Sequence, residues 1–242
     1  MRIVSWNCNG AFRKKINSLL RLSPDIAVIQ ESESPSALTS LESSYSINDK
    51  VWVGDSVNRG LGVYSFSDAK LTVYSGYDND YKYIVPIVVH TKNPFTIVAI
   101  WAKQDKFYTY NGQLKCALEY YSKLLEGPCL VIGDWNASAI WDDKNGRGFS
   151  TNSSWLANKK FLSAYHEWFG EYFGNESKPT LYFRRNKEMK YHIDYCFLTK
   201  DLYKNIHEVY VGDYRDWIEL SDHMPLVVDI GTQNDATFLK AD

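Results

Sequence analysis

Residues 129–136 read CLVIGDWN, an apolar run that ends in polar groups. A short, continuous apolar run of this kind is typical of a strand that is buried on both faces. Gly133 permits a tight exit from the strand. Asp134 and Asn136 then lie on one side, because side chains of an extended chain alternate with a period of two. We therefore expect a carboxylate and an amide at the end of a buried strand.

Two later segments have the same form, a strand end that carries ionisable groups. HIDY, residues 192–195, begins an apolar strand with Asp194, and SDHMP, residues 221–225, places Asp222 and His223 just before another. A histidine that is oriented by a carboxylate can protonate or electrostatically hold an anionic oxygen. The two segments therefore add a carboxylate–imidazole pair to the expected site.

The N-terminal part of the chain supplies further candidates. Asn7 and Asn9 follow an apolar strand in SWNCNG, residues 5–10. An asparagine after a strand is usually a turn former, so Asn7 becomes a candidate ligand only together with acidic groups elsewhere. Glu31 continues the apolar run DIAVIQ, residues 25–30, where a bound cation would offset the cost of burying its charge.

Carboxylates gathered at one point indicate a metal site. Close carboxylates repel each other and raise one another's pKa unless a divalent cation neutralises them. Carboxylate and amide oxygens are hard donors, which suit Mg²⁺ or Mn²⁺ better than zinc. In such a site Asp134 can act as general base on a water molecule, and Asn136 can donate its NH₂ to a charged oxygen on phosphorus. The set predicts a metal-dependent phosphoester hydrolase.

The remaining pattern predicts the architecture that holds these segments. The expected helices cover residues 12–22, 34–41, 111–125 and 155–169. The expected further strands cover residues 2–6, 25–30, 51–53, 61–66, 70–75, 82–90, 95–101, 193–198, 208–211 and 225–230. This order indicates an α/β protein of two stacked mixed sheets with helices outside. We expect one domain over residues 1–242, with its core at about 2–230 and a polar tail from Thr232.

Composition narrows the class of protein. The 242 residues include 27 basic and 29 acidic side chains, which gives a net charge of −2. A protein that binds nucleic acid through its overall charge would have a strong excess of basic residues, which this sequence does not have. The 4 cysteines lie far apart without a CxxC pattern, which indicates buried thiols in a reducing compartment. No apolar run approaches the ~20 residues of a membrane span. We expect a cytoplasmic monomer that is not associated with a membrane and has no obligate protein partner.

The chain resembles the endonuclease/exonuclease/phosphatase superfamily in its ordered segments SWNCNG, IQE, GDWN, HIDY and SDHMP, and in RGLGVYSF, residues 59–66. The resemblance covers about residues 2–230. It implies a four-layer α/β/β/α sandwich in which the motifs meet at one rim. It also implies that Asn7 and Glu31 hold the principal Mg²⁺, with Asp222 contributing directly or through water.

The same resemblance implies the catalytic roles. Asp134 would orient and deprotonate the attacking water, and Asn136 would stabilise the pentavalent phosphorane. His223, paired with Asp194, would bind the scissile phosphate. One departure concerns Trp101, which stands where the abasic-site endonuclease branch usually has a tyrosine that contacts the phosphate. A tryptophan has no hydroxyl to donate.

Two loops combine basic and aromatic side chains, residues 103–115 and residues 183–192. Basic groups interleaved with rings suit a nucleic-acid backbone with exposed bases, although a solvated basic hairpin is an equally good explanation. The second loop comes directly before Asp194, which favours a role at the site. The candidate substrate contacts are Asn9, Trp101, Arg184 and Arg185.

The leading hypothesis is a Mg²⁺- or Mn²⁺-dependent nuclease or phosphodiesterase that cleaves DNA or RNA by in-line attack of water. One alternative is a phosphatase or phosphodiesterase for a small organic phosphate. Another is a catalytically silent protein that binds nucleic acid. The complete set of motifs argues against the silent protein, because a binding module has no need for five metal-site segments.

Overall fold

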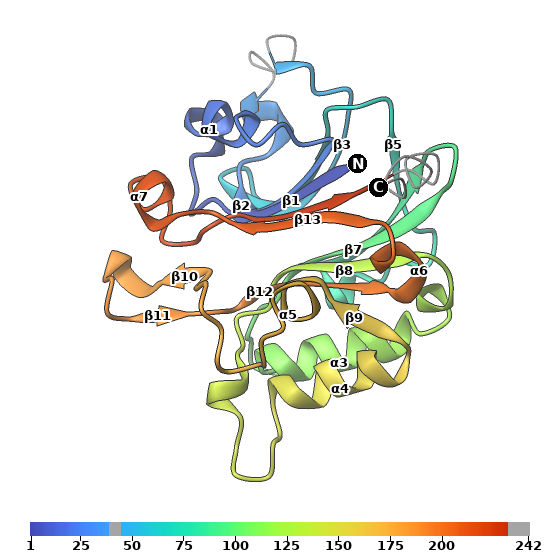
Figure 1. The fold of residues 1–242 in the computed structure, drawn as a ribbon. Coiled ribbons are helices and arrows are strands. Elements are labelled where there is room, and N and C mark those ends of the chain that lie inside the picture. Colours follow the sequence, from blue (N-terminus) through green and yellow to red (C-terminus); the bar gives the residue numbers. More distant parts are fainter. Residues whose placement is uncertain (39–44, 232–242) are drawn as a thin grey trace, which may run out of the picture.

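Two six-stranded sheets stack face to face in the computed structural model, which describes residues 1–38 and 45–231 (Figure 1). The first sheet has, in order, β13 (Ile206–Val211), β14 (Leu226–Ile230), β1 (Arg2–Asn7), β2 (Ile26–Ser32), β4 (Arg59–Ser65) and β3 (Asp49–Ser56). The second has β5 (Lys70–Val73), β6 (Ile84–His90), β7 (Phe95–Trp101), β8 (Cys129–Asp134), β12 (Asp194–Thr199) and β9 (Phe161–Ser163). Both sheets are mixed, because β1 runs parallel to β2 and β7 parallel to β8 while the other pairs are antiparallel.

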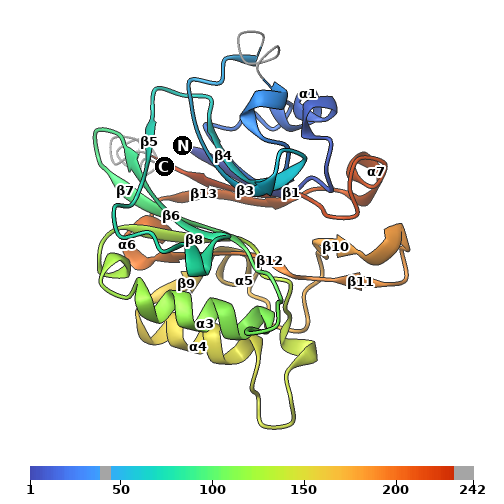
Figure 2. The same cartoon turned by 180° about the vertical axis from the view of Figure 1, so that it is seen from behind.

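Helices cover the outer faces of the two sheets. Helix α1 (Ile16–Leu20) lies outside the first sheet, and α3 (Tyr110–Tyr120) and α4 (Phe149–Asn158) lie outside the second (Figures 1 and 2). Further α-helices are α5 (Ala164–Phe169), α6 (Lys200–Tyr203) and α7 (Tyr214–Trp217), and residues 35–38 are also helical. The short 3₁₀ segments are η1 (Phe12–Lys14), η2 (Asn79–Tyr81), η3 (Leu124–Glu126), η4 (Ala139–Trp141) and η5 (Phe183–Arg185). The α/β/β/α layering that the sequence predicted is confirmed.

The apolar runs of the second sheet are continuous because both of its faces are buried. In β8, Leu130 and Ile132 pack between the sheets, while Cys129 and Val131 face the layer of α3 and α4. The same alternation divides β7, in which Ala99 belongs to the core between the sheets. Strands with two buried faces therefore have no polar alternation in sequence.

Gly133 is required where β8 leaves the sheet toward the site. Its φ of 147° is a conformation that side chains rarely adopt, and a Cβ there would lie 2.0 Å from the carbonyl oxygen of Ile100. Ile100 is its direct partner in the parallel β7–β8 pair. The close approach of two backbones thus sets the exit from β8 that the GDWN segment indicated.

The single aromatic helix expected at residues 155–169 is wrong. Helix α4 begins earlier, where the Asp142 carboxylate accepts hydrogen bonds from the backbone of Phe149 at 2.6 Å and Ser150 at 2.9 Å. Lys160, with a φ of 66°, lies just past the end of α4. The next three residues pair with β12 as the edge strand β9, before α5 begins. A left-handed residue other than glycine carries no stop signal in the sequence.

Smaller differences concern helix ends. The helix expected at 12–22 is η1 followed by the short α1, and the helix expected from Asn111 begins one residue earlier. Thr109 caps that helix, since its hydroxyl accepts a hydrogen bond from the amide of Gly112 at 3.1 Å. The expected end of a helix near residue 41 and the expected tail from Thr232 lie outside the described residues.

Within residues 1–38 and 45–231, none of the helices has the length and apolar character needed to span a bilayer. The expectations of a single domain, a monomer and a cytoplasmic location stay predictions.

Candidate active site

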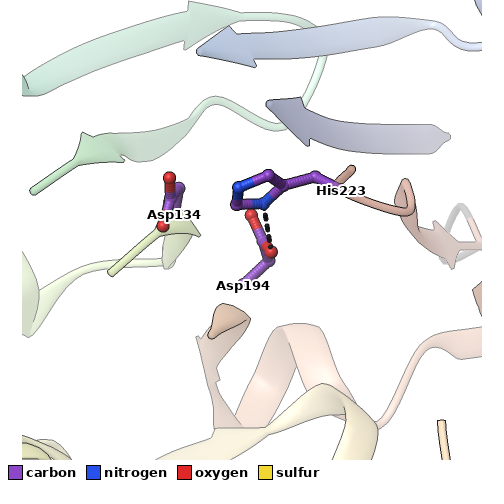
Figure 3. Close-up of side chains that lie close together, drawn as sticks. All are labelled: Asp134, Asp194 and His223. Atoms are coloured by element: carbon purple, nitrogen blue, oxygen red, sulfur yellow. Dashed lines mark hydrogen bonds and ion pairs between the residues drawn. The ribbon is translucent and has the colours of Figure 1, made fainter. Parts of the chain in front are cut away.

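The two sheets meet at one rim, where three of the expected side chains lie together. β1 ends at Asn7 and β8 ends at Asp134, and the Nδ2 of Asn7 donates to Oδ2 of Asp134 at 3.0 Å across the sandwich. Asp194 begins β12 directly opposite Asp134 in the antiparallel pair. His223 lies beside both carboxylates (Figure 3). One possible ligand atom from each of Asp134, Asp194 and His223 lies within 4.8 Å of the other two.

Asp134 is fully buried and held from several directions. Its Oδ1 accepts from the backbone amide of Asn136 at 2.8 Å, and its Oδ2 accepts from the Asn136 side-chain amide at 3.2 Å. Asn136 adopts a φ of 48°, and its Nδ2 also donates to the carbonyl oxygen of Ala102 at 3.1 Å. With the Asn7 contact, three N–H groups fix the carboxylate in one orientation, as a general base requires.

His223 forms a pair with Asp194. Its Nδ1 lies 3.0 Å from Oδ2 of Asp194, and its other ring nitrogen faces Asp134 (Figure 3). The backbone of His223 is fixed as well, because its amide donates to the Ser221 hydroxyl at 3.0 Å and its carbonyl accepts from the Trp6 indole at 2.9 Å. The imidazole is therefore oriented by a carboxylate and by two backbone contacts.

Asp134, Asp194 and His223 interact electrostatically, and this interaction shifts the pKa of Asp134 and of His223. Burial and the nearby charge of Asp194 raise the pKa of Asp134 to about 7. Burial alone would lower the pKa of His223, but the charge of Asp194 and the hydrogen bond to it raise that pKa to about 10. At neutral pH the site therefore holds an imidazolium paired with Asp194 and a carboxyl group, Asp134, that is poised to exchange a proton.

A bound metal has two candidate positions. The first is the group of Asp134, Asp194 and His223. In this position Nδ1 of His223 already contacts Oδ2 of Asp194 at 3.0 Å, so an ion could take only the other ring nitrogen. The second is the group of Asn7, Glu31 and Asp222 at the same rim. Its carboxylate and amide groups offer the hard oxygen donors that Mg²⁺ and Mn²⁺ require, so the residues fit such an ion.

The rim residues are linked by hydrogen bonds. Asn7 Nδ2 lies 3.4 Å from Oε1 of Glu31, and Asn7 Oδ1 accepts from the amide of Asn9 at 3.0 Å. The Asn9 side chain in turn donates to Oδ1 of Asp222 at 3.2 Å. The Asn7 carbonyl accepts from the Ser221 hydroxyl at 2.7 Å, so the rim and the His223 segment share one network.

Glu31 lies at a β-bulge. The register of β2 against β4 shifts between Gln30 and Ser32, and Glu31 has a φ of 61°. Its side chain is 17% exposed and its Oε2 lies 2.9 Å from the Arg59 guanidinium. The bulge turns the carboxylate out of the β2–β4 ladder and toward the rim.

The position of Trp101 does not favour its expected role as a substrate contact. Its ring is only 2% exposed and packs edge-on against Tyr83, with ring centroids 5.0 Å apart. The ammonium of Lys103 lies 3.2 Å from the Trp101 ring centroid. The buried ring therefore supports Lys103 and does not itself present a face to a substrate.

Arg184 and Arg185 lie at the exposed tip of a hairpin between β10 (Leu181–Tyr182) and β11 (Lys190–Tyr191), which projects from the sandwich at the rim (Figures 1 and 2). The base of the hairpin is tied to the site by a bridge between Leu181 and His223 and by the amide of Tyr182, which donates to the Asp222 carbonyl at 2.8 Å. The hairpin is thus positioned beside the candidate catalytic groups.

The sequence did not indicate several residues that build the site. The hydroxyl of Thr180 accepts from the amides of Ile193 and Asp194, each at 3.0 Å, and so fixes the start of β12. Arg59 and Lys103 bring positive charge near Glu31. Both residues belong to segments noted in the sequence, residues 59–66 and 103–115, but their place near Glu31 depends on the fold.

Comparisons with known proteins agree with this geometry. The model of the Endonuclease/Exonuclease/phosphatase family matches residues 4–223. A comparison with curated proteins found no match.

Several solved structures are similar in fold. The 3′ phosphatase NExo from Neisseria, bound to a product DNA hairpin, has a TM-score of 0.68 at 16% identity, covering 96% of this chain and 100% of its own. An AP endonuclease from Archaeoglobus fulgidus has a TM-score of 0.69 at 18% identity, with 96% and 100% covered. The endonuclease domain of TRAS1, a telomere-specific non-LTR retrotransposon, has a TM-score of 0.66 at 20% identity, with 96% and 99% covered.

Proposed function

The chain belongs to the Endonuclease/Exonuclease/phosphatase family of phosphoester hydrolases, and we propose that it is a divalent-metal-dependent nuclease acting on DNA or RNA. The observation that carries the proposal is the meeting of Asp134, Asp194 and His223 within 4.8 Å at the rim where the two sheets converge. A carboxylate and an imidazolium that are held side by side can serve a reaction in which one group removes a proton and the other stabilises an anion.

Asp134 takes the proton of the attacking water in this proposal. Its orientation is set by Asn7 and Asn136, and its raised pKa makes it a better base near neutral pH than an ordinary carboxylate. The Asn136 amide lies next to the same carboxylate and donates to an oxygen of the reacting phosphate. Asn136 would first exchange its present contact with Ala102 for that oxygen.

His223 binds the scissile phosphate through the ring nitrogen that does not contact Asp194. The positive charge that Asp194 maintains on the imidazole attracts the phosphate oxygen and stabilises charge that develops on it. Asp194 itself is a positioning residue, because it acts on the substrate only through His223.

Asn7, Glu31 and Asp222 would hold a Mg²⁺ or Mn²⁺ ion beside these groups. When bound, the ion supplies Lewis-acid stabilisation of charge on the phosphoryl and leaving oxygens. The donor set supports this assignment, as does the hydrogen-bond network that links Asn7 and Asp222 through Asn9.

A nucleic-acid substrate is supported by the basic residues around the site. Arg184 and Arg185 lie on the projecting hairpin. Lys15 lies beside the acidic rim, because its Nζ donates to the Cys8 carbonyl at 2.6 Å and to the Asn9 carbonyl at 3.4 Å. The net charge of −2 is no obstacle, because the local charge near the site is what a phosphate backbone meets. The similar NExo structure is itself bound to a DNA hairpin.

The first experiment is cleavage of end-labelled oligonucleotides: single-stranded DNA, duplex DNA, an abasic-site duplex, a 3′-phosphorylated duplex and RNA. Each is incubated with Mg²⁺, Mn²⁺ or EDTA. Asp134→Asn removes the base at constant shape, and Asp201→Asn at an exposed site on α6 is the matched control. EDTA-sensitive cleavage that is lost only in Asp134→Asn supports the proposal. Normal cleavage by Asp134→Asn would refute the assignment of the base.

A further inference from the structure

We propose that Arg59 is an internal counterion of the metal site: its guanidinium contacts the Glu31 carboxylate and competes with a divalent cation for it. The inference rests on the proposed function, because it requires that Glu31 is a metal ligand. It adds a residue that sets the cation affinity of the site and that lies on a different strand from Glu31.

The contact is built by two adjacent irregularities in the first sheet. The β2–β4 register skips Glu31, since Gln30 pairs with Leu61 and Ser32 pairs with Gly60. The β3–β4 register shifts in turn, and its last pair joins Ser56 to Arg59, the first residue of β4. The bulged carboxylate and the first side chain of the neighbouring strand therefore emerge at the same corner of the sheet.

At that corner both oxygens of Glu31 are engaged. Oε2 lies 2.9 Å from the Arg59 guanidinium, and Oε1 lies 3.4 Å from the Asn7 amide nitrogen. A cation that coordinates Glu31 needs one of these oxygens and brings like charge toward the guanidinium. Binding of the cation and retention of the Arg59 contact therefore oppose each other.

The two side chains differ in their freedom to separate. Glu31 is 17% exposed and is fixed by the bulge, whereas Arg59 is 54% exposed. A solvated arginine can leave the carboxylate without desolvation cost, so the competition is reversible.

The test measures Mn²⁺ binding directly by isothermal titration calorimetry and by the electron paramagnetic resonance signal of free Mn²⁺, without substrate. Arg59→Met keeps an unbranched apolar stem, shorter than that of arginine, and removes the charge. We expect it to bind Mn²⁺ about two- to fivefold more tightly than the parent protein, since an exposed ion pair and its charge are removed. Arg59→Lys should fall between the two. Arg147→Met, which breaks an exposed arginine–carboxylate pair before α4, is the matched control and should not change the affinity.

Glu31→Gln separates the two proposals. Weaker Mn²⁺ binding in Glu31→Gln together with tighter binding in Arg59→Met supports both. Weaker binding in Glu31→Gln with unchanged or weaker binding in Arg59→Met overturns the counterion role and leaves the metal assignment in place. Unchanged binding in Glu31→Gln overturns the metal assignment, and the counterion role with it. Circular dichroism of each variant excludes loss of folding as the cause.

Discussion

Asp194 lies directly opposite Asp134 in the antiparallel pair of β12 and β8, so two buried carboxylates share one end of a sheet. Such a pair is unfavourable unless one group is protonated or a cation lies beside it. His223 provides that cation through its contact with Asp194 at 3.0 Å. The three residues are therefore one electrostatic unit, and a change in any of them alters the others.

Asp194→Asn should lower kcat and raise KM, because the His223 charge both attracts the scissile phosphate and stabilises charge that develops on it. The amide keeps a hydrogen-bond acceptor near His223 but removes the largest charge that raises the histidine pKa, so the imidazolium is less favoured at neutral pH. We expect kcat to fall on the order of 10- to 100-fold, as for partners that orient a reacting group. Steady-state kinetics on the preferred oligonucleotide measures this. An unchanged kcat would show that the Asp194 charge has no part in the reaction.

Gly133→Ala should destabilise the fold by roughly 3 kcal/mol or more, because a Cβ cannot fit where two backbones approach closely. The added atom would lie 2.0 Å from the Ile100 carbonyl oxygen at a φ of 147°. Urea denaturation measures the free energy of unfolding. Gly127→Ala is the matched control, since its φ is −89° and nothing lies within 4 Å of the added atom. A small effect at position 133 equal to that of the control would contradict the packing argument.

The positions of Asp134 and Asp194 could be predicted because each lies at the end of a buried strand. An apolar run that ends at Asp134 and another that begins after Asp194 mark these two carboxylates locally, and the layers follow from the order of such runs. The β-bulge at Glu31 left no local mark, and its contact with Arg59 depends on the register of β2 against β4. β2 is buried on both faces and has no polar alternation, so its sequence does not fix its register against β4.

Two other features lay beyond sequence for different reasons. The break between α4 and α5 comes at Lys160, whose left-handed conformation is imposed by the pairing of Phe161–Ser163 with β12 and not by its own propensity. Trp101 has the composition of a stacking platform, yet Tyr83 and Lys103 cover it. Burial of a single aromatic ring is a tertiary property that one strand cannot reveal.

His192 should make stability depend on pH. Its Nδ1 donates to the Lys178 carbonyl at 2.8 Å, and burial lowers its pKa from 6.5 to about 4, against the charges of Glu176 and Asp194. Between these values the unfolded chain binds a proton that the folded protein excludes. The free energy of unfolding therefore falls as pH falls from 6.5 toward 4, by up to about 3 kcal/mol.

Urea denaturation at pH 7.5 and pH 5 tests this dependence. His192→Gln cannot be protonated, so its stability should fall by about 2 kcal/mol less than that of the parent protein between the two values. His90→Gln, at an exposed position in β6, should leave the dependence unchanged. An equal loss in the parent protein and in His192→Gln would show that other groups cause the acid sensitivity.

Arg184 and Arg185 should contribute to affinity through salt-dependent attraction to phosphates and not to the chemical step. The double change of Arg184→Gln and Arg185→Gln should raise KM for an oligonucleotide and leave kcat nearly unchanged. It should also reduce the slope of log KM against log salt by roughly one unit for each phosphate that the variant no longer neutralises. Arg147→Gln, which is exposed on the loop before α4, is the control and should preserve the slope. If the hairpin is merely solvated, the double variant will keep both the parent KM and the parent salt slope.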